Sequence, residues 1–270
     1  MPKFELTKNP PKTTKNAKKN KYAIAIVKGN KDNKNYNKFL VLDDEIKNKG
    51  IHRIEIDDDV CFQILPNVDK NKRDIFYLAG SSGSGKSYVA RTIADNYHKM
   101  YPDRKIYIIS KLDEDDTLDG MKAPFHRLKY EKLVEFPIDI NEFSHSLVIF
   151  DDYDTITGKV GKAVHALIED IAIMGRKHSD KQGCITMLCL THYITNYKKT
   201  RLLLNEANYF VVYPQATSSH ALTYLLKKHL GFEKKDIKKL KRMGRWVCFH
   251  KSYPQYLLSS QYAQILHQED

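Results

Sequence analysis

Cysteine is scarce in this sequence, and its spacing is irregular. The residues are Cys61, Cys184, Cys189 and Cys248. None of them forms a paired spacing typical of a zinc site or a disulfide framework, which excludes a small disulfide-stabilised domain. Two of the four lie in apolar runs, so we expect reduced core residues of an intracellular protein.

Long apolar runs are also lacking. No segment approaches the length that a membrane-spanning helix needs, and the lysine-rich start of the chain has no apolar signal-peptide core. We therefore expect a soluble protein without a membrane span. The 270 residues, 41% of them hydrophobic, are enough for a large α/β domain with a real core.

Acidic residues are outnumbered, with 33 Asp and Glu against 45 Lys and Arg, for a formal charge of +12. This excess favours a polyanionic partner such as nucleic acid, although solubility alone would also explain it. Residues 1–21 carry much of it and have little to bury, so we expect a disordered basic tail that either contacts DNA or is merely solvated. Short β-type runs predict a small β-rich lead-in over residues 22–72 and leave 73–270 for the main domain.

Residues 80–87 read GSSGSGKS and match the phosphate-binding pattern G-x-x-x-x-G-K-[ST] at every fixed position. An apolar run at 74–79 predicts a buried strand before it, and helical spacing at 87–100 predicts a helix after it. The glycines allow backbone N–H groups to surround a polyphosphate at the helix N-terminus. The expected nucleotide-binding residues are Gly80, Ser81, Ser82, Gly83, Ser84, Gly85, Lys86 and Ser87.

The loop pattern also assigns individual roles. Lys86 is expected to reach the β- and γ-phosphates of ATP, and the Ser87 hydroxyl to bind Mg²⁺. Further along, the apolar run Ser-Leu-Val-Ile-Phe over 146–150 ends in Asp151 and Asp152 and resembles a Walker B segment. Parallel strands bring their carboxyl ends to one sheet edge, so Asp151 is expected to hold Mg²⁺ and Asp152 to orient or deprotonate water. The alternative is an ordinary acidic loop after a core strand.

About 65 residues separate Lys86 from Asp151, enough for a helix, a strand at 105–110 and a further helical stretch. This spacing is typical of P-loop proteins in which an additional strand lies between the loop strand and the acidic strand. We therefore expect a RecA-like α/β fold, a mainly parallel central sheet with helices on both faces. In such proteins hydrolysis is favoured over transfer to a small acceptor.

Two further roles, an arginine finger and a γ-phosphate sensor, each have two candidate residues. A helix at 160–174 precedes Arg176, which is a candidate arginine finger for a neighbouring subunit, and Arg201 could take the same part. A strand at 184–190 ends in Thr191 and His192, either of which could sense the γ-phosphate. Because the chain supplies no obvious arginine close to its own phosphate loop, we expect a ring.

The last third of the chain predicts two helices, at 219–230 and 234–242. The second is very basic and could face DNA, or its lysines could form one solvated face. We expect edge strands at 245–251 and 253–258, because Pro254 suits an edge better than a centre, followed by a short final helix.

Taken together, GSSGSGKS, LVIFDD, GRKHSDKQGCITMLCLTH, TRLLLNEANYFVVYP and GRWVCFHKSYPQYLL resemble the genome-packaging ATPases of large double-stranded DNA viruses, the poxvirus-type branch of the FtsK/HerA superfamily. The resemblance spans roughly residues 73–260. It implies an ATP- and Mg²⁺-dependent motor that forms a homo-oligomeric ring, a pentamer or hexamer, on double-stranded DNA at a capsid portal or vertex. By position, it assigns catalytic roles to Lys86, Asp152, Arg176 and His192.

The same resemblance implies a place of action in the host cytoplasm, in a viral factory or on the virion. Two departures affect catalysis. Many RecA-like motors have Glu where this chain has Asp152. They commonly have Gln where this chain has His192, and a histidine at this position would make turnover sensitive to pH near neutrality. The rival interpretations are a monomeric P-loop kinase or nucleotide switch, and a DNA-binding protein with a vestigial nucleotide site.

Overall fold

A computed structural model of the chain describes residues 2–10, 21–43, 51–67, 69, 71–175, 184–194 and 197–266. Its strands are β1 Lys3–Thr7, β2 Lys21–Gly29, β3 Phe39–Asp43, β4 Arg53–Glu55, β5 Val60–Ile64, β6 Ile75–Ala79, β7 Ile106–Ser110, β8 His126–Lys129, β9 Leu147–Phe150, β10 Thr186–Thr191, β11 Tyr209–Val212, β12 Val247–His250, β13 Tyr256–Ser259 and β14 Tyr262–Ile265. Its helices are α1 Lys86–Met100, α2 Lys132–Glu135, α3 Gly158–Met174, α4 Tyr197–Glu206, α5 Ser219–Tyr224 and α6 Lys234–Leu240, with the short turns η1 Ile140–Phe143, η2 Tyr153–Thr155 and η3 Leu225–His229.

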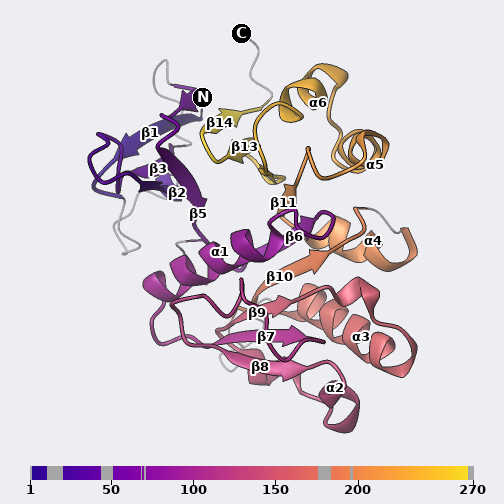
Figure 1. The fold of residues 1–270 in the computed structure, drawn as a ribbon. Helices are drawn as coiled ribbons and strands as arrows, with labels where there is room; N and C mark the ends of the chain where they lie inside the picture. Colours follow the sequence, from indigo (N-terminus) through magenta and orange to yellow (C-terminus); the bar gives the residue numbers. More distant parts are fainter. Residues whose placement is uncertain are drawn as a thin grey trace.

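A ten-stranded sheet in the order β4-β14-β13-β12-β11-β6-β10-β9-β7-β8 forms the centre of the molecule (Figure 1). From β11 to β8 all neighbours are parallel, and we call these strands the parallel half. From β12 to β4 the pairing is antiparallel, and we call these strands the antiparallel half. Strand β10 lies between β6 and β9, which confirms the prediction of an intervening strand and of the α/β fold class.

Each face of the sheet is covered because the central strands are apolar on both sides. In β6, Phe76 and Leu78 pack in the core cluster that contains α1, whereas Ile75, Tyr77 and Ala79 pack in the cluster that contains α3 and α4. All five are essentially inaccessible to solvent. Continuous apolar strands of this kind are expected where a parallel sheet is buried between helices. Among the described residues, no helix combines the length and the apolar character needed to cross a bilayer.

A second, four-stranded antiparallel sheet in the order β1-β3-β2-β5 lies beside β13 and β14, on the upper left of Figure 1. A backbone hydrogen bond joins the two sheets: Phe62 N of β5 donates to Ser260 O, between β13 and β14, at 2.7 Å. Strand β4, which lies between β3 and β5 in the chain, pairs with β14 of the ten-stranded sheet. The N-terminal segment thus both caps and extends the main sheet.

The prediction of a disordered tail over residues 1–21 is wrong at its start. Strand β1 pairs with β3, and Phe4 is only 2% exposed because its ring packs in the same core cluster as Tyr256. The polar and basic composition of the tail gives no sign of this strand. One buried aromatic residue is enough to fix a strand when the edge of a neighbouring sheet is available for pairing. Residues 11–20 lie outside the described residues.

The C-terminal predictions also need correction. Strands β12 and β13 were expected at an edge, but both are internal, and the expected final helix is β14. Pro254 precedes β13 instead of lying in it, so it removes no hydrogen bond from the ladder. The edges of the ten-stranded sheet are β4 and β8.

Candidate active site

Four parallel strands end together at one edge of the sheet. Thr191 at the end of β10 pairs with Ala79 at the end of β6, and Phe150 at the end of β9 pairs with Ile109 of β7. The loops that follow these strands therefore start side by side, as expected for a ligand site in an open parallel sheet. They carry the residues of the phosphate loop, the two aspartates, and Thr191 and His192.

The phosphate loop adopts a conformation that needs its glycines. Gly83 and Gly85 have φ angles of +72° and +107°, which side chains with a Cβ rarely adopt. At Gly80 a Cβ would come within 2.7 Å of the Tyr213 ring and 2.8 Å of Ser84 Oγ. The loop closes directly on the N-terminus of α1, whose free N–H groups favour anions.

Lys86 is the first residue of α1, and its side chain turns back over the loop. Its Nζ donates to Gly80 O at 2.9 Å and to Ser81 O at 3.3 Å. The same ammonium lies 3.9 Å from Asp152 Oδ1. Burial lowers the pKa of Lys86 below its usual value, an effect that the negative charge of Asp152 opposes. The lysine and the second aspartate of the acidic pair thus share one site.

Asp151 follows β9 directly and is 5% exposed. Its Oδ2 accepts a hydrogen bond of 3.0 Å from Ser110 Oγ at the end of β7, and its backbone carbonyl accepts one of 2.9 Å from Tyr130. Burial, followed by the charge of Asp152, raises the pKa of Asp151 from 3.8 to about 6. A buried carboxylate with this raised pKa gains from a nearby cation.

Asp152 turns back toward the loop through a left-handed backbone conformation, with φ at +49°. A non-glycine residue with this φ carries strain of roughly 1–2 kcal/mol, which is common at functional sites. Its Oδ2 lies 2.9 Å from His192 Nε2, and its buried Oδ1 has no hydrogen-bond partner. The carboxylate is therefore held between an imidazole and the Lys86 ammonium, with one oxygen unsatisfied.

Asp154, a residue that the sequence patterns did not single out, fixes the end of β10. Its buried Oδ2 accepts hydrogen bonds from Thr191 Oγ1 at 2.6 Å and from the backbone N–H groups of His192 and Tyr193, both at 3.0 Å. Thr191 is fully buried and turned toward Asp154, while His192 reaches Asp152. The sequence offered one signal for this residue: Asp154 is a third aspartate, two residues after Asp152.

Arg245 is a second residue that sequence reasoning missed. From the turn before β12, its Nε donates to Ser84 O and its Nη2 to Gly83 O, both at 3.1 Å. An arginine of the same chain thus lies against the phosphate loop, and the premise that none lies close to it is wrong. Arg245 stands in the Gly-Arg-Trp-Val motif that carried part of the family resemblance, but no local pattern links that motif to residue 84.

The serines of the loop differ in their surroundings. Ser81 Oγ donates to Ala216 O at 2.7 Å, which ties the loop to the segment after β11. Ser82 is exposed at the loop tip, and Ser87 is partly buried in the first turn of α1. Ser84 is buried, and its hydroxyl has no hydrogen-bond partner.

Both candidate fingers stay predictions. Arg176 lies outside the described residues, one position beyond the end of the segment that contains α3. Arg201 lies within α4.

The residues at this edge fit a nucleotide phosphate and a divalent cation. The loop provides glycines in left-handed conformations, a helix N-terminus, a lysine and a buried hydroxyl without a partner. The described part of the chain contains no group of three acidic, His or Cys side chains placed to hold a metal ion by themselves. Mg²⁺ is usually bound by one or two carboxylates together with substrate phosphates, and Asp151 provides a buried carboxylate at this edge.

Comparison with known proteins provides a family. No family model matches the chain. It is 30% identical over 216 residues to the uncharacterized protein V3 of Sputnik virophage, a match that covers 76% of this chain and 82% of V3. The chain belongs to the same family as V3.

Several solved structures are similar at low sequence identity. The genome-packaging NTPase B204 of Sulfolobus turreted icosahedral virus 2, in complex with sulfate, has a TM-score of 0.46 at 14% identity, over 74% of this chain and 100% of that one. The pCW3 conjugation coupling protein TcpA has a TM-score of 0.48 at 13% identity, over 88% and 77% of the two chains. The Type VII secretion ATPase EccC of Thermomonospora curvata has 0.49 at 14% identity, over 94% of this chain and 29% of EccC.

Proposed function

We propose that this protein is an ATP-hydrolysing motor that moves viral double-stranded DNA into a capsid. The observation that carries the proposal is the meeting of Lys86, Asp151 and Asp152 at one sheet edge, with Lys86 Nζ only 3.9 Å from Asp152. The family tie to a virophage protein and the motif resemblance support a viral role. The position of β10 between β6 and β9 favours hydrolysis over the rival kinase interpretation.

In this proposal the chain first binds the triphosphate of ATP. Backbone N–H groups of residues 80–87 surround the phosphates, and the Lys86 ammonium exchanges the carbonyls of Gly80 and Ser81 for phosphate oxygens. This exchange is favourable because the phosphate oxygens are negatively charged, and a negative charge stabilises a buried ammonium more than neutral carbonyl groups do. Ser87 and Asp151 would hold Mg²⁺, which, when bound, neutralises charge that develops on the phosphates.

Asp152 is the proposed catalytic carboxylate for water. Its unsatisfied Oδ1 provides an acceptor at the right edge for the proton of an attacking water. When His192 Nε2 carries a proton, it donates to Asp152 Oδ2 and fixes the orientation of the carboxylate. We propose His192 rather than Thr191 as the sensor, because Thr191 is buried against Asp154.

The proposed assembly is a homo-oligomeric ring, a pentamer or hexamer, around double-stranded DNA at a capsid portal or vertex. Arg176 is the proposed finger for the neighbouring subunit, with Arg201 as the alternative. Arg245, which contacts the loop of its own chain, could supply positive charge without a neighbour. The proposed place of action is the infected host cell or the virion.

The test is phosphate release from ATP by the purified full chain with Mg²⁺, measured with and without duplex DNA. A motor predicts release that duplex DNA accelerates and that Lys86→Ala removes. Release that does not respond to DNA would contradict translocation while leaving an ATPase. Transfer of phosphate to a small acceptor would favour the kinase, and DNA binding without any turnover would favour a vestigial site.

A further inference from the structure

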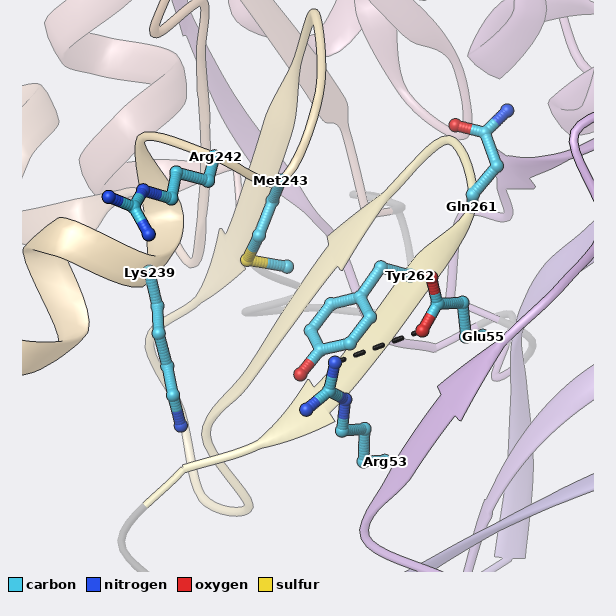
Figure 2. A pocket seen from close by; sticks show the side chains of 7 residues that line it. All are labelled: Arg53, Glu55, Lys239, Arg242, Met243, Gln261 and Tyr262. Atoms are coloured by element: carbon cyan, nitrogen blue, oxygen red, sulfur yellow. Dashed lines mark ion pairs between the residues drawn. The ribbon is translucent and has the colours of Figure 1, made fainter.

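A second candidate site lies away from the phosphate loop, between α6 and the edge strand β4. It is an open pocket of about 270 Å³. Its lining residues are Arg53, Glu55, Lys239, Arg242, Met243, Gln261 and Tyr262. In Figure 2, Arg53 enters from the β4 side and Lys239 from the α6 side, with the Tyr262 ring beside Arg53. Three separate chain segments therefore form one pocket.

The pocket carries an excess of positive charge. Three of its side chains are cationic and one is anionic. The one ion pair among them joins Arg53 Nη2 to Glu55 at 3.8 Å, and both side chains are more than half exposed, so the pair neutralises little. Within the described chain, the side chains of Lys239 and Arg242 form no ion pair. Gathering such cations is unfavourable unless an anion joins them.

The aromatic ring of the pocket orients one of these cations. The Arg53 guanidinium lies 4.6 Å from the centroid of the Tyr262 ring, and Tyr262 OH is itself fixed by a 2.9 Å hydrogen bond to Gln264. A guanidinium stacked on a ring keeps its N–H edge free for two parallel hydrogen bonds. Phosphate oxygens match that edge, so the pocket suits a phosphate group.

We infer that this pocket binds the phosphate backbone of duplex DNA. The inference rests on the proposed function for the identity of the substrate. A repeating polyanion is favoured over a single phosphate because positive charge continues beyond the pocket along α6, where exposed Lys235 lies one helical turn before Lys239 on the same side of the helix. Its ion pair with exposed Glu233, at 3.3 Å, neutralises little of that charge. Such a surface contacts successive phosphates of a duplex without reading its sequence.

The pocket is also connected to the phosphate loop through very few residues. Arg242 and Met243 line the pocket, and Arg245 donates to Gly83 O and Ser84 O of the loop. Gly244, with φ at +123°, makes the turn between them. A duplex held by Arg242 would thus bias the loop through Arg245. Because such coupling is reciprocal, ATP and DNA should each raise the affinity of the other by the same factor.

The experiment measures binding of a fluorescent duplex to the full chain, without nucleotide, over a range of salt concentrations. Lys239→Ala and Arg242→Ala should each weaken binding several-fold and lower the slope of log affinity against log salt by about one. The matched control is Lys238→Ala, which removes the same charge from the next residue of α6 but does not line the pocket. Thermal melting verifies that each variant is folded.

Equal losses in all three variants, or none, would overturn the inference, since the pocket would then be no better than any exposed lysine. Inorganic pyrophosphate serves as a second probe. If it displaces the duplex at equal phosphate concentration, the pocket is a small-anion site and the duplex assignment is wrong. Weak displacement supports the duplex.

A third arm tests the coupling, with duplex affinity measured with and without a non-hydrolysable ATP analogue. We expect the analogue to strengthen binding in the wild type and to lose that effect in Arg245→Ala. An effect that persists in Arg245→Ala would overturn the connection through this residue. If the wild type fails to hydrolyse ATP, the proposed function fails, whereas the nucleotide-free binding data still decide the pocket.

Discussion

The parallel and antiparallel halves of the ten-stranded sheet differ in where their strands end. In the parallel half, β6, β10, β9 and β7 all end at one edge, and the loop residues that follow them meet there. In the antiparallel half, successive strands end at opposite edges, so no comparable set of loops can gather. The candidate site residues therefore lie at the edge where the parallel strands end together.

The antiparallel half still reaches the site, through one side chain. Arg245 enters from the turn before β12 and contacts two carbonyls of the phosphate loop. The comparison therefore separates residues that should act on ATP directly from one that should act by holding the loop. Substitutions in each half can test this division.

The largest effect is expected for Lys86→Ala in the parallel half. Removing the buried ammonium should lower ATP turnover by about 10²–10³-fold or more, because in the proposed site its charge would face the transferred phosphate. Phosphate release and binding of a fluorescent ATP analogue measure the two losses. Lys99→Ala, an exposed lysine of the same helix, is the matched control and should leave both values unchanged.

Asp154→Asn should have the next largest effect and should act on turnover alone. Weakening a buried carboxylate that accepts three hydrogen bonds costs about 1–3 kcal/mol, so turnover should fall roughly tenfold to a hundredfold as His192 loses its position. ATP affinity should stay the same, because Asp154 does not touch the phosphate loop. A parallel rise in KM would show that Asp154 does more than position β10. Asp103→Asn, at an exposed turn, is the control.

Arg245→Ala tests the antiparallel half and should weaken ATP binding by roughly tenfold. Two charge-assisted hydrogen bonds to the loop are lost, but the guanidinium is exposed, so the effect is smaller than for Lys86. Arg245→Lys keeps the positive charge but loses the paired hydrogen bonds, so its ATP affinity should lie between those of the wild type and Arg245→Ala. If both variants bind ATP as the wild type does, the loop does not depend on the antiparallel half.

The last of these predictions concerns stability and its dependence on pH, not turnover. Since the folded pKa of Asp151 is about 6, above its usual 3.8, its contribution to stability is present at low pH and is lost as pH rises through about 6. At pH 7.5 the cost is at most about 3 kcal/mol. Without nucleotide or metal, Asp151→Asn should therefore raise the Tm at pH 7.5 by a few degrees, and the gap should close near pH 4.

A gap between wild type and Asp151→Asn that is independent of pH would show that the substitution acts by packing and not by charge. The pH dependence that remains in the variant belongs in part to Asp74, whose burial also raises its pKa to about 6. Catalysis should show the opposite trend. At limiting Mg²⁺, turnover should fall as pH drops through about 6, because protons then compete with the cation for Asp151.

The two halves also differ in how far the sequence predicts them. The strand, loop and helix around residues 80–87 and the strand that ends at Asp151 are predicted correctly because each depends on a continuous stretch of a few residues. The intervening strand was predicted from the spacing between these two stretches. The antiparallel half was misjudged, since β14 is a strand only because it pairs with β13 and with β4, some 200 residues earlier. No local pattern contains that partner.

The same reasoning applies within the site. The order of the parallel strands places Asp152 and His192 at one sheet edge, whereas the contacts of Asp154 and Arg245 depend on side-chain directions and on a turn distant in sequence. Ser110 was included in a predicted strand, but its hydrogen bond to Asp151 required the neighbouring strand to be known. Local sequence patterns carry no information about contacts between residues that are distant in the chain.

One measurement bears most directly on the site: a single turnover of Mg²⁺-bound ATP by the wild type and by Asp152→Asn, with ATP binding recorded in the same samples. If the carboxylate beside Lys86 prepares the attacking water, Asp152→Asn should bind ATP as the wild type does and release phosphate about 10²-fold more slowly. Equal rates of release in the two proteins would contradict the assignment of this sheet edge as the hydrolytic centre.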